Sequence, residues 1–312
     1  MASRLNCDDA LAVELVAACE SGERDIVSSF LDRGGDPSTR VSFPWDRDNP
    51  PPLLWFALQH GHPDIAMLML ERGADVDYRD VAGRNLLPWG LISAGVMKHL
   101  LARGLNFADA ATQSGEQLLY QAARQSNCTA EVVSMLLDAG ADIKSGLVEP
   151  FTGRLLCQPI HAAALFGRFD LVSCFISRGV DPDVRSARGL GPVDYLAGNV
   201  FANEDDAEAV FGSLLALGVD MNRLNGQGRA PLHSAARLGR EQNCRVLLRL
   251  GAHIDVRARS NETPLVLAAE EGHAAVCELL LDHGADPDAS TAVGRPARSL
   301  AGFPGNRRDH AV

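Results

Sequence analysis

Two histidines that flank a glycine are the first residues of this sequence with the potential for metal chemistry. Imidazole groups bind transition metals, and His60 and His62 stand on either side of Gly61. The same glycine–histidine pair recurs far along the chain as Gly272 and His273. A dipeptide that recurs at corresponding places is typical of a repeated turn. We therefore expect a structural role for this turn, and neither a metal nor any other cofactor.

Three aspartates, Asp46, Asp48 and Asp194, are the candidates for proton transfer. Such groups catalyse reactions when a largely closed cavity shifts their pKa values. The sequence contains no G-x-S-x-G or H-E-x-x-H motif. The glycine pairs at 189–191 and 226–228 follow no predicted strand and lack a third glycine, so we interpret them as hairpin turns rather than phosphate-binding loops. We expect no catalytic residue and keep the aspartates for an alternative hypothesis.

Two similar segments show how the chain is organised. Residues 230–255 read APLHSAARLGREQNCRVLLRLGAHID and residues 263–288 read TPLVLAAEEGHAAVCELLLDHGADPD, so that Pro231 and Pro264 lie 33 positions apart. A fixed period of this size indicates a repeat architecture. The phrase L-L-x-x-G-x-D recurs with variations at eight places, whose glycines are Gly34, Gly73, Gly104, Gly140, Gly179, Gly218, Gly251 and Gly284.

Each copy predicts two short helices. A proline begins the first helix, where its missing N–H is not needed, and Gly239 or Gly272 ends that helix in the last two full copies. In the second helix apolar residues recur at i, i+3 and i+4, and the glycine that follows can adopt the left-handed conformation of a C-cap. One helix pair cannot cover its own apolar face, so several pairs must stack on one another.

At these residues the sequence resembles the ankyrin repeat family. The resemblance is strongest at 159–184, 230–255 and 263–288, and it extends from about residue 5 to residue 301. It implies an all-α fold, a solenoid of stacked helix pairs with inter-repeat β-hairpin loops and a concave face that binds other proteins. It also implies that His161 and His233, at the family's histidine position, tie their own repeat to the adjacent hairpin.

The resemblance also suggests the domain organisation. We predict a single ankyrin-repeat array over 1–302 with about eight full repeats, in which the first repeat is an N-terminal cap and a partial ninth occupies 291–302. We expect residues 303–312 to form a disordered tail. The third copy departs most from the family because Pro88 and Trp89 stand in its first helix.

The net charge of −11 limits the classes of partner. Nucleic-acid binding requires a basic surface, so we expect no nucleic-acid role. An exposed or basic segment of another protein suits an acidic chain better, and we do not expect a small-molecule ligand. The chain has neither an apolar run of about 18 residues nor the regions of a signal peptide, so we expect no membrane partner. We therefore predict a cytoplasmic or nuclear protein.

The seven cysteines are interpreted as structural residues. They form no C-x-x-C pair, and Cys174, Cys244 and Cys277 fall on core positions of second helices. Cysteine is a small apolar residue when it is buried. We therefore expect neither disulfides nor zinc ligands among them.

Three copies are longer than the 33-residue period. In two of them the extra residues lengthen the hairpin, at 41–52 and 144–157, and we call these segments the two fingers. In the third the extra residues fall between the helices, around 199–208, and we expect a looser and more acidic segment there. Insertions often gather on the binding face of a repeat protein, so the fingers are candidates for partner contacts.

Aromatic residues cluster in the same part of the chain. All three tryptophans, Trp45, Trp55 and Trp89, lie there, and aromatic side chains are the usual anchors of binding hot spots. Trp55, Trp89 and Tyr120 have the alternative role of filling the core where histidine-mediated packing is lost. The candidate partner-binding residues are Trp45, Asp46, Arg47, Asp48, Trp55, Phe56, Trp89, Tyr120, Phe151 and Arg154.

These observations predict a protein–protein interaction scaffold or adaptor. Its partner would lie in the concave groove and between the two fingers. The alternative is an unusual enzyme on the same scaffold, in which the fingers roof an aromatic pocket and Asp46, Asp48 or Asp194 transfers protons.

Overall fold

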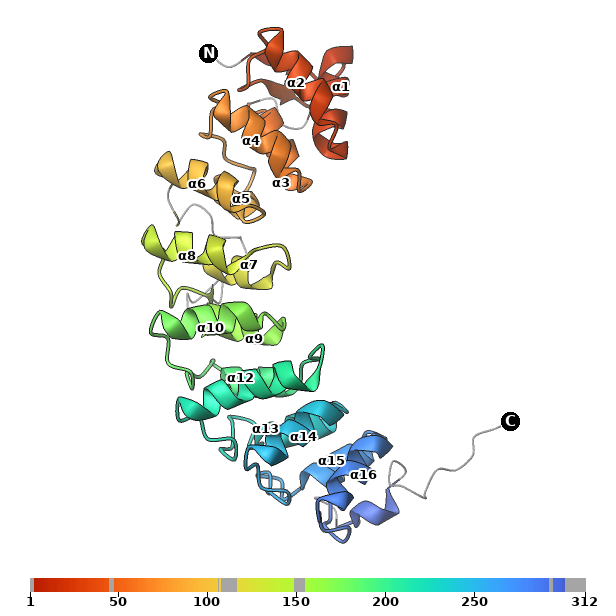
Figure 1. Ribbon diagram of the computed structural model, residues 1–312. Coiled ribbons are helices and arrows are strands. Elements are labelled where there is room, and N and C mark those ends of the chain that lie inside the picture. The colour runs from red at the N-terminus through yellow and green to blue at the C-terminus, as the bar shows by residue number, and fades with distance from the viewer. Residues whose placement is uncertain are drawn as a thin grey trace, which may run out of the picture. The chain divides into compact units, whose positions relative to one another are not determined.

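The computed structural model describes residues 3–44, 48–105, 107, 117–148, 155–291 and 294–300. Within these ranges the chain forms sixteen α-helices, which follow one another as pairs (Figure 1). The chain divides into two compact units, Met1–Leu155 and Leu156–Val312, which we call unit 1 and unit 2.

Unit 1 contains the first four helix pairs among the described residues. Its helices are α1 (Ala10–Ser21), α2 (Arg24–Asp32), α3 (Leu53–Gln59), α4 (Pro63–Glu71), α5 (Leu87–Gly90), α6 (Ala94–Ala102), α7 (Leu118–Arg124) and α8 (Ala130–Asp138). Its short strands are β1 (Arg4–Asn6), β2 (Arg40–Ser42) and β3 (Leu147–Val148), while β4 (Leu155–Cys157) lies at the boundary with unit 2.

Unit 2 contains four further pairs and a final 3₁₀ turn. Its helices are α9 (Pro159–Leu165), α10 (Phe169–Ser177), α11 (Pro192–Ala197), α12 (Glu204–Ala216), α13 (Pro231–Arg237), α14 (Glu241–Arg249), α15 (Pro264–Glu270), α16 (Ala274–Asp282) and η2 (Ala297–Ser299). The turn η2 packs on α15, where the sequence predicts the start of a partial ninth repeat.

Each unit is built in two layers. In unit 1 the first helices α1, α3, α5 and α7 contact one another in sequence, and so do the second helices α2, α4, α6 and α8. In unit 2 the first helices α9, α11, α13 and α15 form the same kind of row. Leucine, alanine and other apolar residues are buried between the layers. This is the all-α ankyrin-repeat solenoid that the sequence predicts.

The glycines that mark the repeat end the second helices as expected. All eight have a positive φ, between 70° and 94°. L-residues with a side chain rarely adopt this left-handed conformation, which glycine tolerates. The sequence prediction of a glycine C-cap in every copy is therefore confirmed.

Two glycine-containing turns of unit 2 form the tips of neighbouring hairpins. The N–H of Gly226 donates a hydrogen bond to the carbonyl of Gly189 at 2.9 Å. A Cβ atom added to Gly226 would lie 2.1 Å from the carbonyl oxygen of Arg188, so the two backbones can approach this closely only without a side chain. The glycine pairs at 189–191 and 226–228 are hairpin turns, as predicted.

The base of the first finger is well anchored. The Val41 N–H donates to the Pro51 carbonyl at 3.0 Å, and the Leu53 N–H donates to the Thr39 carbonyl at 2.9 Å. In addition β2 pairs in parallel with β1, with Leu5 opposite Val41. The tip at 45–47 and residues 149–154 of the second finger lie outside the described residues.

The longer sixth copy differs from the sequence expectation. We expected a loose segment between its helices, but the extra residues partly lengthen α12 to 13 residues, where α10 and α14 have 9. Phe201 is buried and its ring stacks on that of Phe169, with centroids 4.2 Å apart. The acidic residues at 204–206 form the first turn of α12, where the helix dipole favours negative charge.

Two histidines tie their own helix pair to the next hairpin. His161 accepts a hydrogen bond from the Gln158 N–H at 3.0 Å, and its Nε2 lies 2.9 Å from the Val184 carbonyl oxygen. His233 makes the same two contacts, to the Ala230 N–H and to a carbonyl oxygen of the next hairpin. The role that the family resemblance implies for these two residues is confirmed.

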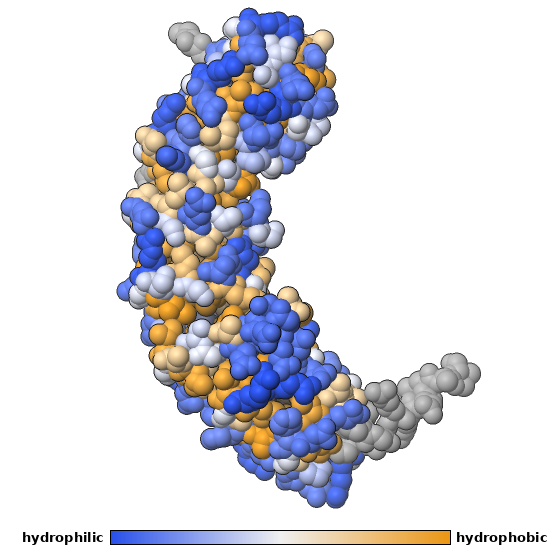
Figure 2. Space-filling view, in the orientation of Figure 1, coloured by the Kyte–Doolittle hydropathy of each residue, from blue (hydrophilic) through white to orange (hydrophobic). Residues whose placement is uncertain are grey.

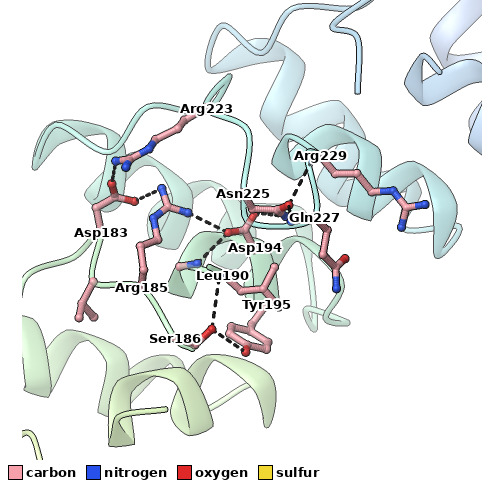
Figure 3. A network of polar contacts seen from close by, with 12 residues as sticks. Asp183, Arg185, Ser186, Leu190, Asp194, Tyr195, Arg223, Asn225, Gln227 and Arg229 are labelled. Carbon is pink, nitrogen blue, oxygen red and sulfur yellow. Dashed lines mark hydrogen bonds and ion pairs between the residues drawn. The ribbon is translucent and has the colours of Figure 1, made fainter. Parts of the chain in front are cut away.

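Asp194 occupies the corresponding position in the repeat between these two. It also contacts its own N-cap and the next hairpin, but it accepts both hydrogen bonds. One carboxylate oxygen accepts from the Gly191 N–H at 2.8 Å, as a histidine Nδ1 would. The other cannot donate to a carbonyl, and it accepts instead from Asn225 Nδ2 of the next hairpin at 2.9 Å (Figure 3). The donor and the acceptor have therefore exchanged places across the junction.

An arginine completes this polar network. Arg185 forms ion pairs with Asp183 at 2.6 Å and with Asp194 at 3.2 Å (Figure 3). Arg223 of the following hairpin also pairs with Asp183. Burial raises the pKa of Asp194, while the hydrogen bonds from Gly191 and Asn225 and the charge of Arg185 lower it.

Several of the cysteines belong to the core as free thiols. Cys19, Cys244 and Cys277 are buried, and burial raises the pKa of Cys19 and Cys244 to about 12. Cys174 is partly exposed, which differs from the expected core position. Among the described residues, the helices are too short or too polar to cross a membrane.

The histidine ties predict a pH dependence of stability. Burial lowers the pKa of His161 and His233 from the ordinary value of 6.5. As the pH falls through 6.5 the unfolded chain takes up protons that the folded imidazoles do not, so the folded state loses stability. We expect the urea midpoint to fall between pH 7.5 and pH 5.5. The double variant His161→Gln, His233→Gln should lose part of this dependence, whereas His253→Gln, at an exposed position, should keep it.

The exchanged donor and acceptor predict that the family's own histidine is unfavourable at position 194. Asp194→His would point an N–H at the Asn225 amide, and we expect a loss of about 1–3 kcal/mol in the free energy of unfolding. Asn225→Asp alone should also destabilise, because two carboxylates would face each other. Together the two changes restore one donor and one acceptor, so a double-mutant cycle by urea unfolding should show recovery. Additive losses would contradict this account.

Candidate functional site

Trp55 takes the histidine position in the second repeat. It lies six residues before the turn glycine Gly61, as His161 lies six residues before Gly167. Its ring meets the next hairpin through Tyr78, with ring centroids 6.0 Å apart, so an aromatic contact replaces the polar tie. The indole Nε1 is buried and has no hydrogen-bond partner in the part of the chain that the structure describes.

Trp55 is the centre of an aromatic cluster that comprises Trp55, Phe56, Tyr78 and Trp89. The Trp55 ring meets those of Phe56 and Trp89 edge to face, at 5.1 and 6.1 Å between centroids. Phe43 of the first finger extends the cluster, with its ring centroid 5.9 Å from that of Phe56. Edge-to-face pairs of this kind add about 0.5–1.5 kcal/mol each beyond the burial of their area.

Trp89 reaches the surface at the edge of the cluster. It lies in α5, and it is partly exposed, as is Trp55. The Arg84 guanidinium carbon lies 5.0 Å from the Trp89 ring centroid, a cation–π contact. Arg84 also pairs with the buried carboxylate of Asp80 at 2.6 Å. The arginine is therefore held in place from two sides, and it fixes one face of the indole.

A pocket opens beside Trp89. Its volume is about 360 Å³. Its walls combine apolar residues with polar ones, and they come from α3, α5 and the turns after α3, α5 and α7. The lining residues are Leu58, Gln59, His60, Gly61, Pro88, Trp89, Ile92, Gln125 and Asn127. Trp89 thus offers an apolar ring next to hydrogen-bonding groups, a combination that suits a peptide segment.

The other predicted aromatic contacts lie in the core. Phe56 is 5% exposed and Tyr120 is 6% exposed, so little of either side chain can meet a partner. Asp48 is exposed beside the tip of the first finger. The remaining predicted contacts lie outside the described residues, namely Trp45, Asp46, Arg47, Phe151 and Arg154.

Sequence analysis missed the hairpin residues that complete the cluster. Tyr78, which is 2% exposed, lies 23 positions after Trp55. Val184 lies at the same distance after its partner His161. Aligning each histidine position with the hairpin residue 23 places later would have found Tyr78. Arg84 had no such signal, because its contact with Trp89 depends on how the hairpin folds back on α5.

Of the three carboxylates that the enzyme hypothesis names, Asp46 lies outside the described residues, Asp48 is exposed, and Asp194 is occupied by structural contacts. Asp194 is 7% exposed, and its oxygens are held by Gly191, Asn225 and Arg185. The His62 imidazole has a structural contact as well, since its Nε2 lies 2.9 Å from the carbonyl oxygen of Glu20 in the preceding helix pair. Among the described residues no group of three or more histidine, cysteine or acidic side chains could hold a metal ion.

Known proteins match both units of the chain. Residues 199–291 match the family described as "Ankyrin repeats (3 copies)" and residues 51–81 match "Ankyrin repeat". Neurogenic locus notch homolog protein 2 of Homo sapiens is 31% identical over 171 residues, which cover 54% of this chain. The E3 ubiquitin-protein ligase KEG of Arabidopsis thaliana is 25% identical over 258 residues, 81% of this chain.

A third relative is the ankyrin repeat and KH domain-containing protein mask-1 of Caenorhabditis elegans, 27% identical over 235 residues and 67% of this chain. The matched part of these three relatives is small, at 6%, 15% and 9% of their own lengths. The similarity therefore concerns the repeat array alone. The helix pairs, the glycine C-caps and the histidine ties agree with both family matches, and the chain belongs to the ankyrin repeat family.

Proposed function

We propose that this chain is a protein-binding module that holds an exposed segment of a partner protein against the first helices and hairpins of unit 1. The observation that carries the proposal is the pair of partly exposed tryptophans, Trp55 and Trp89, on neighbouring first helices. Tryptophan is enriched among the few residues that supply most of the energy in protein interfaces. Membership of the ankyrin repeat family supports the same role.

The surroundings of Trp89 favour a peptide over a purely apolar ligand. Gln59, Gln125 and Asn127 line the same pocket and carry amide groups that can bond to a peptide backbone. Arg84 holds the indole ring in a fixed orientation, so the Trp89 side chain loses less conformational entropy when a partner binds. A rigid aromatic ring beside amide groups is the arrangement expected for an interface core with a polar rim.

The charge of the chain favours a basic partner segment. The net charge is −11, and long-range attraction raises the association rate with a partner of opposite charge. Polar residues cover much of the face drawn in Figure 2, with apolar residues between them in both units. We infer that basic residues in the partner guide the encounter, while Trp55 and Trp89 supply the apolar contact.

The finger residues are included in the proposed interface as further contacts. They would extend the contact area from the cluster, because Phe43 at the base of the first finger already touches Phe56. Free cysteines suit a reducing compartment, so we place the interaction in the cytoplasm or the nucleus. The finger residues proposed as contacts are Trp45, Asp46, Arg47, Asp48, Phe151 and Arg154.

No observation favours the enzyme alternative. Asp194 is held by a backbone N–H, an amide and a guanidinium, which accounts for its burial without a catalytic role. A general acid or base must reach the proton of a bound substrate.

Trp89→Ala should weaken partner binding at least tenfold, because truncating an aromatic anchor costs about 2 kcal/mol or more. The assay pans a displayed library of random peptides against the full chain and measures the dissociation constants of the selected peptides by fluorescence anisotropy. Phe166→Ala, an exposed aromatic residue of unit 2, is the matched control and should leave these constants unchanged.

Thermal unfolding of each variant separates binding from stability. If Trp89→Ala keeps the wild-type melting temperature and still binds every selected peptide with wild-type affinity, the tryptophan pair is not the binding site. Arg84→Ala should weaken binding less than Trp89→Ala, because it frees the ring without removing it. The selected peptides should also bind more weakly at higher salt if their basic residues contribute.

A further inference from the structure

A second pocket lies in unit 1, between α1 and the first finger. Its volume is about 250 Å³, and its walls are almost entirely apolar. Val13 of α1 lines this pocket and is 56% exposed. The lining residues are Cys7, Ala12, Val13, Val16, Ala17, Glu20, Val41 and Phe43, and we call this cavity the α1 pocket.

The α1 pocket lies in a repeat that lacks the histidine tie. Val16 lies six residues before the turn glycine Gly22, at the position that His161 and His233 occupy in their repeats. Valine is shorter than histidine and cannot bond to the next hairpin. Val16 lines the α1 pocket together with the hairpin residues Val41 and Phe43.

One carboxylate lines the α1 pocket, and a second, that of Asp8, contacts a lining residue without lining the pocket itself. Glu20 lines one end, near the end of α1. At the other end Cys7 lines the pocket, and its thiol contacts a carboxylate oxygen of Asp8 at 3.8 Å. None of the lining residues is basic. From Ala12 to Glu20 the helix rises by about 12 Å, at 1.5 Å per residue.

These dimensions define the occupant. An extended peptide advances by about 3.3 Å per residue, so about four residues cover the length of the α1 pocket. Apolar side chains would enter between α1 and Phe43, and a cationic side chain at each end would meet Glu20 or Asp8. The pocket is smaller than the roughly 300–1,000 Å³ typical of sites for drug-sized molecules, which favours a peptide side chain.

We propose that the α1 pocket binds an extended segment of a partner protein in which apolar residues are flanked on both sides by lysine or arginine. This inference rests on the proposed protein-binding role and gives it a partner chemistry. Phe43 lines the α1 pocket and also touches Phe56 of the aromatic cluster, so one segment can run from the pocket onto the cluster.

The test uses a fluorescein-labelled peptide with the sequence arginine–leucine–alanine–leucine–arginine and the full chain, with binding measured by anisotropy. One comparison peptide has glutamate in place of both arginines, and another has serine in place of both leucines. We expect the first peptide to bind at least tenfold more tightly than either of the others.

Three variants locate the binding. Ala17→Phe fills the α1 pocket from an exposed position and should abolish binding. Glu20→Gln should weaken it at least threefold, because the side chain of Glu20 lines the pocket while its backbone carbonyl still accepts from His62. Glu14→Gln is the matched control: it removes the same charge from an exposed position of α1 that does not line the pocket, and binding should be unchanged.

Several outcomes would overturn the inference. One is equal binding of the arginine and glutamate peptides, and another is full binding by Ala17→Phe with unchanged circular dichroism. A dimer in sedimentation that Ala17→Phe dissociates would assign the pocket to a second copy of the chain instead. If the arginine–leucine peptide does not bind but the selected peptides bind in a way that depends on Trp89, only this inference fails. If Trp89→Ala weakens the binding of none of the selected peptides, the proposed function itself fails.

Discussion

The junction between each first helix and the following hairpin is the contact on which this structure depends. A helix pair of this size cannot bury its own apolar face, so its stability comes from its neighbours. One residue of the first helix meets that junction, and in the repeats of Val16, Trp55, His161 and His233 it lies six positions before the turn glycine. In unit 2, His161 and His233 make it with one accepted and one donated hydrogen bond. Where this residue changes, the junction must be closed by other means.

The chain uses three such alternatives. At Asp194 the hydrogen bond to the next hairpin is kept but reversed, because Asn225 supplies the donor that the carboxylate lacks. At Trp55 the bond is replaced by contact with the ring of Tyr78. At position 16 of α1 a valine, which cannot form such a bond, lines the α1 pocket. The first alternative preserves a closed polar junction, whereas the other two expose apolar material on the face of the first helices.

The two proposed binding surfaces therefore have a common origin. Protein interiors are close-packed, and a repeat that loses a buried polar contact must either refill the space or leave it open. Where large aromatic rings fill this space, the side chains of Trp55 and Trp89 are partly exposed at the surface. In the first repeat, the smaller side chain of Val16 lines the α1 pocket together with Glu20. Both lie in unit 1, and the sequence departs from the histidine pattern throughout that unit.

The sequence by itself determined the repeat, the helix pairs, the glycine C-caps and the roles of His161 and His233. The repeat, the helix pairs and the C-caps follow from local rules, namely helix period, backbone conformation and a phrase that recurs at a fixed spacing. The roles of the two histidines were implied by the resemblance to the ankyrin repeat family. Only the tertiary structure decided that Phe56 and Tyr120 are buried while Trp55 and Trp89 are partly exposed. The side of a ring that faces solvent depends on how hairpin residues such as Arg84 fold back on the first helix, and repeat spacing carries no information about that contact.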